Sequence, residues 1–262
     1  MKSLPPASET LTFQIAMRNR HRKRELESQD YAHLIPSLNQ WAYQDHRLLM
    51  VSGRKDPKSP QHFAIDLIQE VQRSPIPIIW ALSNSRLHGT ETTLTDVLRL
   101  LTVQALQISR SATEDFVVSP AEIELTTAHD EWLKLLSRAL RGLKQVYVVV
   151  DTDILKGSAR SRNQHRAVEL MGKLLRESRS DGLDLKIIIT VRKFLDEWEN
   201  CDEEEPHILR LHSIAQERRG NRRGTRVPHT ARGRASILPI RRGRAKRFTG
   251  LAGQLLISGP SP

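Results

Sequence analysis

Cysteine is almost absent from this sequence of 262 residues, because Cys201 is its only one. A single cysteine excludes an internal disulfide and a cysteine-based metal cluster, and it suits a reducing, intracellular compartment. The sequence also lacks any apolar run of the roughly 20 residues needed to cross a bilayer. Its first residues, MKSLPPASETLTF, have no apolar centre of the kind found in a secretory signal. We therefore expect a cytoplasmic protein that does not associate with a membrane.

Acidic residues are scarce at one end of the chain. Residues 217–262 hold 12 of the 41 lysines and arginines but only one of the 30 acidic residues, and the whole chain has a net charge of +11. This segment therefore carries all of the net charge, and residues 1–216 are neutral overall. Any inference from basicity, such as attraction to nucleic acid, concerns the tail alone.

Short apolar segments alternate with amphipathic ones along most of the chain. The apolar segments are typical of buried strands, and they are residues 47–52, 76–83, 145–151, 185–191 and 207–211. Between them, apolar residues recur at helical spacing, as in the segment that Thr92 or Thr93 is expected to cap. This alternation predicts an α/β fold with a parallel sheet of about five strands and helices on both faces. The residues expected at the centre of the sheet are Met50, Ile79, Val149 and Ile188.

The same pattern divides the chain into four segments. Residues 1–9 are polar and contain prolines, so we expect them to be disordered. Residues 10–44 are expected to form a helical leader, and residues 45–211 the α/β domain. Residues 212–262 are rich in arginine and glycine and are expected to be disordered, since they can bury little apolar surface. Within the domain, residues 109–128 show no regular pattern and are expected to be irregular.

A basic turn follows the first predicted strand, where a phosphate-binding loop would lie. In a P-loop, backbone N–H groups of a glycine-rich turn point at phosphates, a lysine reaches the outer phosphates, and the next Ser or Thr holds Mg²⁺. Gly53, Lys58 and Ser59 occupy such positions in GRKDPKS. The turn is one residue short, however, and Pro57 replaces the second glycine, while Asp56 brings negative charge close to the phosphates. A basic surface turn without a ligand is the alternative.

Two other predicted strands end in polar residues that suit a nucleotide site. Asp151 ends QVYVVVD, where NTPases of this kind place a carboxylate on the Mg²⁺ side. Asp153 follows two residues later and is a weak catalytic candidate for polarising the attacking water. Thr190 and Arg192, at the end of LKIIITVR, are candidates for contact with a γ-phosphate. The alternatives are that Asp151 caps the following turn and that Thr190 belongs to an ordinary buried strand, followed by a solvated arginine.

The order of these segments resembles that of one family. LTFQIAMRNR precedes LNQWAYQDHRLLMVSGRKDPKSP, and VVVDTDIL and IIITVR follow. Over residues 10–211 this resembles the P-loop NTPase domains of fungal NACHT or nephrocystin-like STAND receptors. The resemblance implies a P-loop NTPase-like sheet and Mg-ATP or Mg-GTP as the cofactor. The nucleotide-binding residues that it implies are Gly53, Lys58, Ser59, Thr190 and Arg192. Ser59 and Asp151 would hold Mg²⁺.

Three hypotheses about function follow. The first is a truncated, degenerate NACHT-like domain with weak or absent nucleotide binding, which acts through a protein partner or self-association and is not an active NTPase. The short loop and the lack of the family's acidic pair after VVVD favour it. The second is a functional ATP- or GTP-binding switch or NTPase. The third is a nucleic-acid-binding protein that uses its basic tail.

The third hypothesis depends on residues 218–247, which read RRGNRRGTRVPHTARGRASILPIRRGRAKR. Such a segment resembles RG-type RNA-binding tails, which act through phosphate attraction and arginine stacking. There are two alternatives. Arg-Arg-Gly codons can encode Asp-Glu-Gly one nucleotide later, so the tail could come from a shifted reading frame or a retained intron. It could also be a solvated linker.

Overall fold

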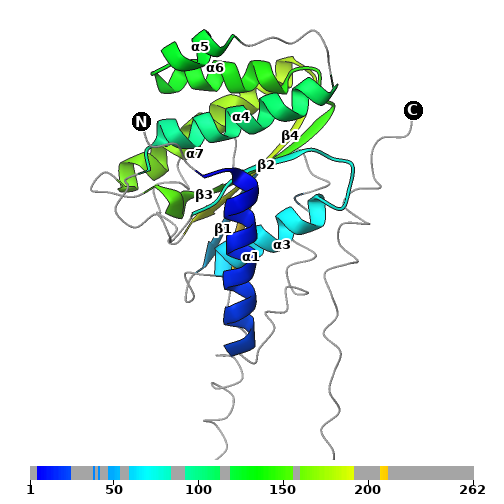
Figure 1. The fold of residues 1–262 in the computed structure, drawn as a ribbon, viewed down its shortest axis with the longest axis vertical. Coiled ribbons are helices and arrows are strands. Elements are labelled where there is room, and N and C mark those ends of the chain that lie inside the picture. The colour runs from blue at the N-terminus through cyan, green and yellow to red at the C-terminus, as the bar shows by residue number, and fades with distance from the viewer. Residues whose placement is uncertain are drawn as a thin grey trace, which may run out of the picture.

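Five parallel strands form a single sheet in the computed structural model (Figure 1). The structure describes residues 5–24, 38, 41, 47–53, 59–83, 92–112, 119–155, 160–191 and 207–211. The strands are β1 (Leu48–Gly53), β2 (Ile78–Ala81), β3 (Gln145–Asp151), β4 (Asp184–Val191) and β5 (His207–Leu211). Their order across the sheet is β2-β3-β4-β1-β5, and every neighbouring pair is parallel. The predicted parallel sheet of about five strands is confirmed.

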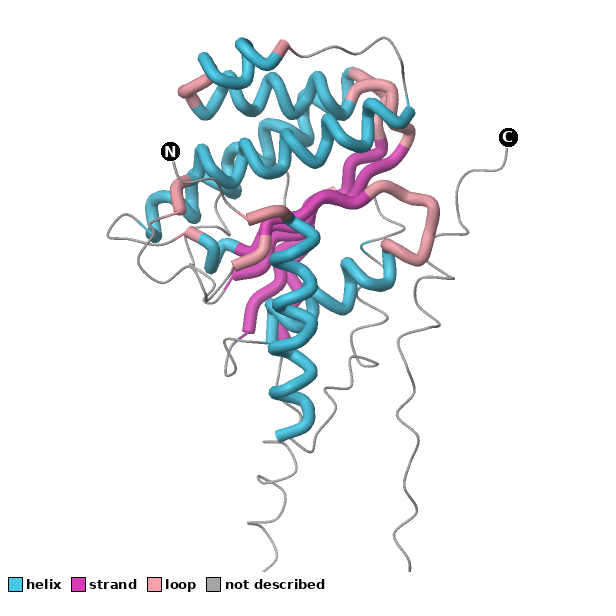
Figure 2. The backbone as a smooth tube through the Cα atoms, viewed as in Figure 1, coloured by secondary structure: helices cyan, strands magenta, loops and turns pink. Residues whose placement is uncertain are grey.

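Helices cover both faces of this sheet, as the sequence predicts. The described helices are α1 (Ala7–Arg24), α3 (Ser59–Val71), α4 (Leu94–Ala112), α5 (Pro120–Leu125), α6 (His129–Leu140) and α7 (Arg160–Ser180), together with the short 3-10 helix η2 (Thr152–Ile154). Helices α4, α6 and α7 form one layer, while α3 and α1 lie on the opposite face (Figures 1 and 2). The sheet is therefore the middle of three layers, with an apolar core on each side.

Alternate residues of each strand supply the two cores. Met50 and Ile79 pack with α4, α6 and α7, whereas Val149 and Ile188 pack with α3. All four side chains are fully buried, which confirms their predicted position. Because side chains of a strand point alternately to its two faces, a strand covered on both sides must be apolar throughout. This requirement explains the continuous apolar runs in the sequence.

Two predicted boundaries are wrong. Helix α1 begins at Ala7, inside the segment 1–9 that was expected to be disordered, and its first turn is closed by the bond from Thr10 N–H to the Pro6 carbonyl, at 3.1 Å. The segment 109–128, expected to be irregular, contains the end of α4 and all of α5. Ser119 caps α5 through a hydroxyl that accepts the Glu122 N–H, so this short helix is specified by its cap and not by apolar periodicity. The tail from residue 212 lies outside the described residues.

Caps and turns elsewhere follow the sequence. The Thr93 hydroxyl accepts the Asp96 N–H at 3.2 Å at the start of α4, and the Asp96 carboxylate accepts the Thr93 N–H at 2.9 Å. Gly142 and Gly182 have φ of 84° and 68°, in the left-handed region that glycine adopts without a steric cost. Among the described residues, no helix is long and apolar enough to cross a membrane.

Candidate functional site at the carboxyl edge of the sheet

The carboxyl ends of all five strands meet at one edge of the sheet, because the strands are parallel. At this edge, β1 leads into α3 on one face, while β3 leads into η2 and α7 on the other. In α/β proteins with helices on both faces of a parallel sheet, ligands bind outside the carboxyl ends of the strands. The predicted site residues that the structure describes lie at this edge.

Asp151 is the centre of a hydrogen-bond network at this edge. Its Oδ1 atom accepts hydrogen bonds from the Thr190 hydroxyl and the Asp153 backbone N–H, both at 3.1 Å. Its Oδ2 atom accepts hydrogen bonds from the Ser83 backbone N–H at 3.2 Å and the Gln61 side-chain amide at 3.3 Å. The residue is only 3% exposed. One buried carboxylate thus joins β4, η2, the segment after β2 and the first turn of α3.

The environment of this carboxylate disfavours its charge. Burial raises the pKa of Asp151 to about 6, and the negative charge of Asp153 acts in the same direction. The hydrogen bonds from the backbone of Asp153 and Ser83 and from Thr190 oppose the rise, because they stabilise the ionised form. Desolvation is the largest of these effects, so the group is less acidic than an ordinary aspartate despite its four donors.

Further polar side chains, which bond to Ser83 and Thr190, extend the network. The Ser83 carbonyl accepts hydrogen bonds from Gln14 of α1 and from Gln61, the latter at 3.4 Å. On the other side, the Thr152 hydroxyl donates to the Thr190 carbonyl at 2.9 Å, and the Gln164 amide of α7 donates to the Thr152 carbonyl at 3.3 Å. The network therefore runs from α1 through the strand ends to α7, and it connects the two helical layers.

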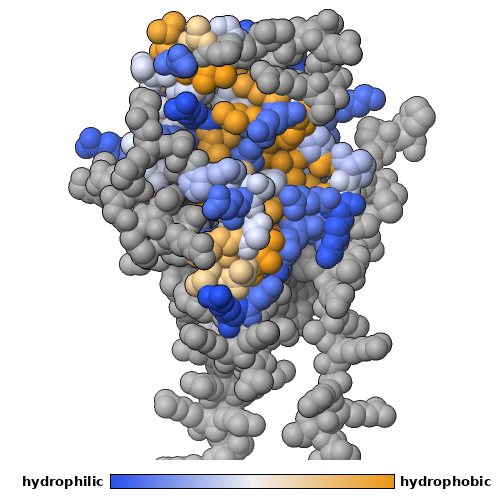
Figure 3. Space-filling model, viewed as in Figure 1, coloured by the Kyte–Doolittle hydropathy of each residue, from blue (hydrophilic) through white to orange (hydrophobic). Residues whose placement is uncertain are grey.

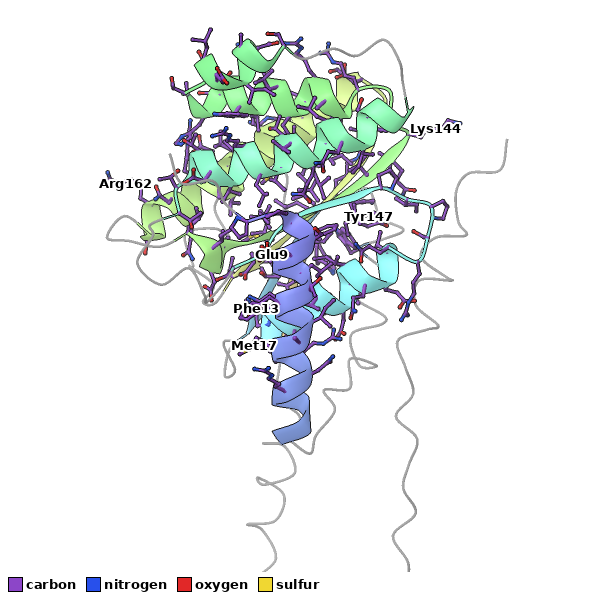
Figure 4. The ribbon with its side chains drawn as sticks, viewed as in Figure 1. Glu9, Phe13, Met17, Lys144, Tyr147 and Arg162 are labelled. Atoms are coloured by element: carbon purple, nitrogen blue, oxygen red, sulfur yellow. The ribbon has the colours of Figure 1, made fainter. Side chains whose placement is uncertain are left out.

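Helix α1 is held against this edge by a line of polar residues. Thr10, Gln14 and Arg18 are spaced four residues apart, and each is buried. Arg18 forms an ion pair with Asp66 of α3. Figure 4 labels Glu9, Phe13 and Met17, which follow one another along an adjacent line of the same helix. Helix α1 also packs Leu11 into the core on this face, so apolar packing and polar contacts with α3 and the segment after β2 together fix its position.

The structure brings together only part of the predicted site. Asp151, Asp153 and Thr190 lie in direct contact through the bonds described above. Gly53 ends β1, and Ser59, which is 7% exposed, is the first residue of α3 at the same edge. Lys58 and Arg192, like Asp56 and Pro57, lie outside the described residues, so their predicted roles stay predictions.

Gln14, Gln61 and Ser83 were not predicted, although they share the network with Asp151. Ser83 follows the second strand, and Asp151 ends the third strand at the same edge of the sheet. The sequence therefore contains a signal that Ser83 lies close to the site. Gln61 lies in the first turn of the helix after the first strand, where a contact with the strand ends is also expected. Gln14 gives no such signal, because its partner is 69 residues away in the sequence.

A magnesium nucleotide at this site would need oxygen ligands that are free to bind Mg²⁺. Mg²⁺ binds oxygen ligands, among them ionised carboxylates, in near-octahedral geometry. Both oxygens of Asp151 already accept two hydrogen bonds from protein groups, and its pKa is raised. Among the described residues, no group of three or more His, Cys, Asp or Glu side chains is placed to hold a metal ion. In this arrangement the described residues do not fit Mg²⁺.

The start of α3 lacks one backbone donor among the described residues. The N-terminal N–H groups of a helix bind phosphate because they have no partner within the helix. Pro60 is the second residue of α3 and has no N–H, so one of these donors is missing. A phosphate at the described start of α3 would therefore meet one backbone donor fewer than at a helix without proline there.

Comparison with known proteins gives a loose likeness in structure. No known protein family and no curated protein matches this sequence. Among solved structures, the fold is similar to a Walker-type ATPase of Pyrococcus abyssi, with 15% sequence identity over 76% of this chain and a TM-score of 0.40. The chain spans 60% of the length of that structure. The likeness concerns the arrangement of the sheet and its helices, and it does not extend to activity.

Proposed function

We propose that this chain is a degenerate P-loop domain of the NACHT type, which binds nucleotide weakly or not at all and acts by associating with another protein. The observation that carries the proposal is the state of Asp151. Its carboxylate accepts four hydrogen bonds from four separate parts of the chain, so it fastens the strand ends to each other and to α3. A residue with this role supports a rigid scaffold and not a metal site.

Nucleotide binding through Asp151 would disrupt contacts that hold the fold together. A ligand-bound Mg²⁺ near this residue would compete with the donors from Gln61 and Ser83, and these two residues also connect α3 and β2. Leaving a buried backbone N–H without an acceptor costs about 1–3 kcal/mol. Ionising the carboxylate at a raised pKa adds a further cost below about pH 6. These costs oppose Mg²⁺-dependent binding.

One observation favours the second candidate, a functional nucleotide-binding switch. Gly53 ends a buried strand, and Ser59 begins a helix at the same edge, which is the strand–turn–helix geometry that a P-loop requires. Lys58 would then reach the phosphates, and Ser59 would contact Mg²⁺. The third candidate, nucleic-acid binding through residues 218–247, stays a prediction from the sequence alone.

Calorimetric titration with ATP and GTP, with and without Mg²⁺, separates the first two candidates. We expect no saturable heat at micromolar concentrations on the full chain, and phosphate release at background level. The variants are Lys58→Ala in the turn and Lys144→Ala as a matched control. Lys144 is an exposed lysine next to the start of β3, at the opposite edge of the sheet (Figure 4). Both variants remove one positive charge.

The outcome that overturns the proposal is specific. If ATP or GTP binds with micromolar affinity, and Lys58→Ala abolishes this binding while Lys144→Ala leaves it intact, then the short loop functions and the chain is a nucleotide-binding switch. Binding that both variants weaken equally would reflect general charge attraction to the basic chain. That result, like no binding, is consistent with the proposed degenerate domain.

A further inference from the structure

A cavity of about 540 Å³ lies away from the candidate nucleotide site, along the free edge of β2. We call it the β2 groove. Its walls are one side of α4, the outer edge of β2 and the first turn of α1, and its main apolar residues are Ile78, Trp80, Leu100, Val103 and Ile108. Its volume falls within the range of about 300–1,000 Å³ that is typical of ligand-binding pockets.

The floor of the β2 groove is an edge strand. Within the described part of the chain, β2 is an outermost strand of the sheet and pairs on one side only, with β3. The backbone N–H and C=O of Trp80 point to the other side, towards α4, where they bond to a side chain. Because successive residues of a strand alternate in direction, the N–H and C=O of Ile78 face the same outer side. An outer edge of this kind can pair with another strand.

The side chain of Gln104 already imitates such a partner. Its Oε1 atom accepts the Trp80 N–H at 3.1 Å, and its Nε2 atom donates to the Trp80 carbonyl at 2.8 Å. One side-chain amide therefore makes the two hydrogen bonds that the backbone of an added strand would make with Trp80 through two successive peptide units. The Gln104 amide also donates to the Leu100 carbonyl of its own helix, at 3.1 Å, so it has an alternative partner. Exchange of Gln104 for the backbone of an added strand would conserve both bonds to Trp80.

The size and surface of the groove suit a short extended chain. Its α4 wall runs from Asp96 to Ile108, which is about 18 Å of helix. Five or six residues of extended chain cover about the same length. Val103 lies on this wall, and its side chain is 38% exposed. Among the described residues, Leu125 is the only other large apolar residue that is exposed. Figure 3 shows apolar side chains gathered around α4 and bordered by hydrophilic ones.

Charge at the rim indicates one feature of the ligand. Arg99 lines the groove and is exposed, and within the described part of the chain its guanidinium forms no ion pair. The nearby Asp96 carboxylate accepts hydrogen bonds from the backbone and hydroxyl of Thr93, so it is engaged in capping α4. The charge left for a ligand is therefore positive, and it complements an acidic side chain.

We propose that the β2 groove binds an extended peptide segment of a partner protein by strand addition to β2, with apolar residues at alternate positions and an acidic residue facing Arg99. Main-chain pairing gives affinity in this mode of recognition, and the side-chain contacts give specificity. The inference rests on the proposed role in protein association and names the surface and the kind of partner.

The test is fluorescence anisotropy on the full chain with a labelled six-residue peptide of alternating valine and threonine that carries one glutamate at its amino end. Two matched peptides accompany it. In one, the amides of alternate residues are N-methylated, which removes backbone donors, and in the other lysine replaces glutamate. We expect N-methylation to weaken binding at least tenfold and the lysine peptide to bind several-fold more weakly.

Protein variants locate the site. Val103→Asp places a charge on the apolar wall and is expected to weaken binding at least tenfold, whereas Leu125→Asp, the matched change at the exposed residue of α5, should change it less than twofold. Arg99→Glu should reverse the preference between the glutamate and lysine peptides. Gln104→Ala should tighten binding several-fold, because it removes the internal competitor for Trp80. Circular dichroism confirms that each variant is folded.

Each result bears on the proposal. No binding up to millimolar peptide, equal binding of the N-methylated peptide, or equal effects of Val103→Asp and Leu125→Asp would overturn it. Weaker binding by folded Gln104→Ala would show that this side chain holds the peptide and is not displaced by it, which also overturns the exchange. Failure here leaves the nucleotide titration unaffected, so the two proposals fail separately.

Discussion

Replacing Asp151 with asparagine tests whether this residue is a buried structural group or an ionised ligand for Mg²⁺. In the folded protein its pKa is about 6, against 3.8 for an ordinary aspartate. A carboxyl group with a raised folded-state pKa contributes stability that is present below the unfolded pKa and is lost as the pH rises through the folded pKa. The wild-type chain should therefore lose this contribution to its free energy of unfolding between about pH 4 and pH 6. Above about pH 6 the contribution is absent.

The magnitude follows from the pKa values. A shift of about two units corresponds to about 3 kcal/mol between the fully protonated and fully ionised states. About half of this, roughly 1–2 kcal/mol, is expected to be lost between pH 5 and pH 8. Asp151→Asn is neutral and removes this dependence, but its amide nitrogen cannot accept the bonds that one carboxylate oxygen accepts. One backbone donor, from Asp153 or Ser83, then lacks an acceptor, which costs about 1–3 kcal/mol at every pH.

The useful quantity is therefore a difference between two pH values. Urea unfolding of wild type and Asp151→Asn at pH 5, 6, 7 and 8 gives the free energy of unfolding of each. We expect the variant to gain roughly 1–2 kcal/mol relative to wild type on going from pH 5 to pH 8. Asp181→Asn is the control, because Asp181 is exposed and pairs with Arg141 at 3.0 Å on the surface. Its difference from wild type should not change over this range.

Two results would refute the reasoning. A difference between Asp151→Asn and wild type that is constant from pH 5 to pH 8 would show that the pKa of Asp151 is not raised. A difference that changes in the opposite direction would show that the fold stabilises the ionised form, as a metal site does. Adding Mg²⁺ with ATP at pH 8 provides a further check. A wild-type gain in stability that Asp151→Asn lacks would contradict the structural role.

Two further predictions concern the rest of the chain. Gly182→Ala should lower the free energy of unfolding, measured in urea, by about 1 kcal/mol. Gly182 has φ of +68° and an added Cβ meets no atom within 4 Å, so backbone strain is the only cost. An unchanged stability would show that the turn between α7 and β4 relaxes. Deleting residues 218–262 should leave the free energy of unfolding of the α/β domain nearly unchanged, because this Arg/Gly-rich segment can bury little apolar surface. A clear loss of stability in the shortened chain would contradict this prediction. Slow amide exchange across the segment in the full chain would contradict it too.

The elements of the sheet could be predicted because each one has a local signature. Runs such as VYVVV and KIIIT are apolar at every position, which only a strand buried on both faces requires. Thr93 marks the start of α4, and Gly182 marks the turn after α7, through the chemistry of single residues. The meeting of Asp151 with Thr190 at one edge also follows, since parallel strands end on the same side.

The tertiary structure alone decided how these elements are combined. The strand order, with β1 between β4 and β5 and β2 at the edge, depends on contacts between segments that are far apart in the sequence. For the same reason, no local pattern predicts that Asp151 bonds to Gln61, 90 residues away, or that Gln104 covers the edge at Trp80. The local periodicity of the sequence predicts which face of a helix or strand is buried. Which other element packs against that face is set by tertiary packing and strand register. That is why the sequence points to a nucleotide site at Asp151, whereas the folded chain surrounds this carboxylate with its own donors.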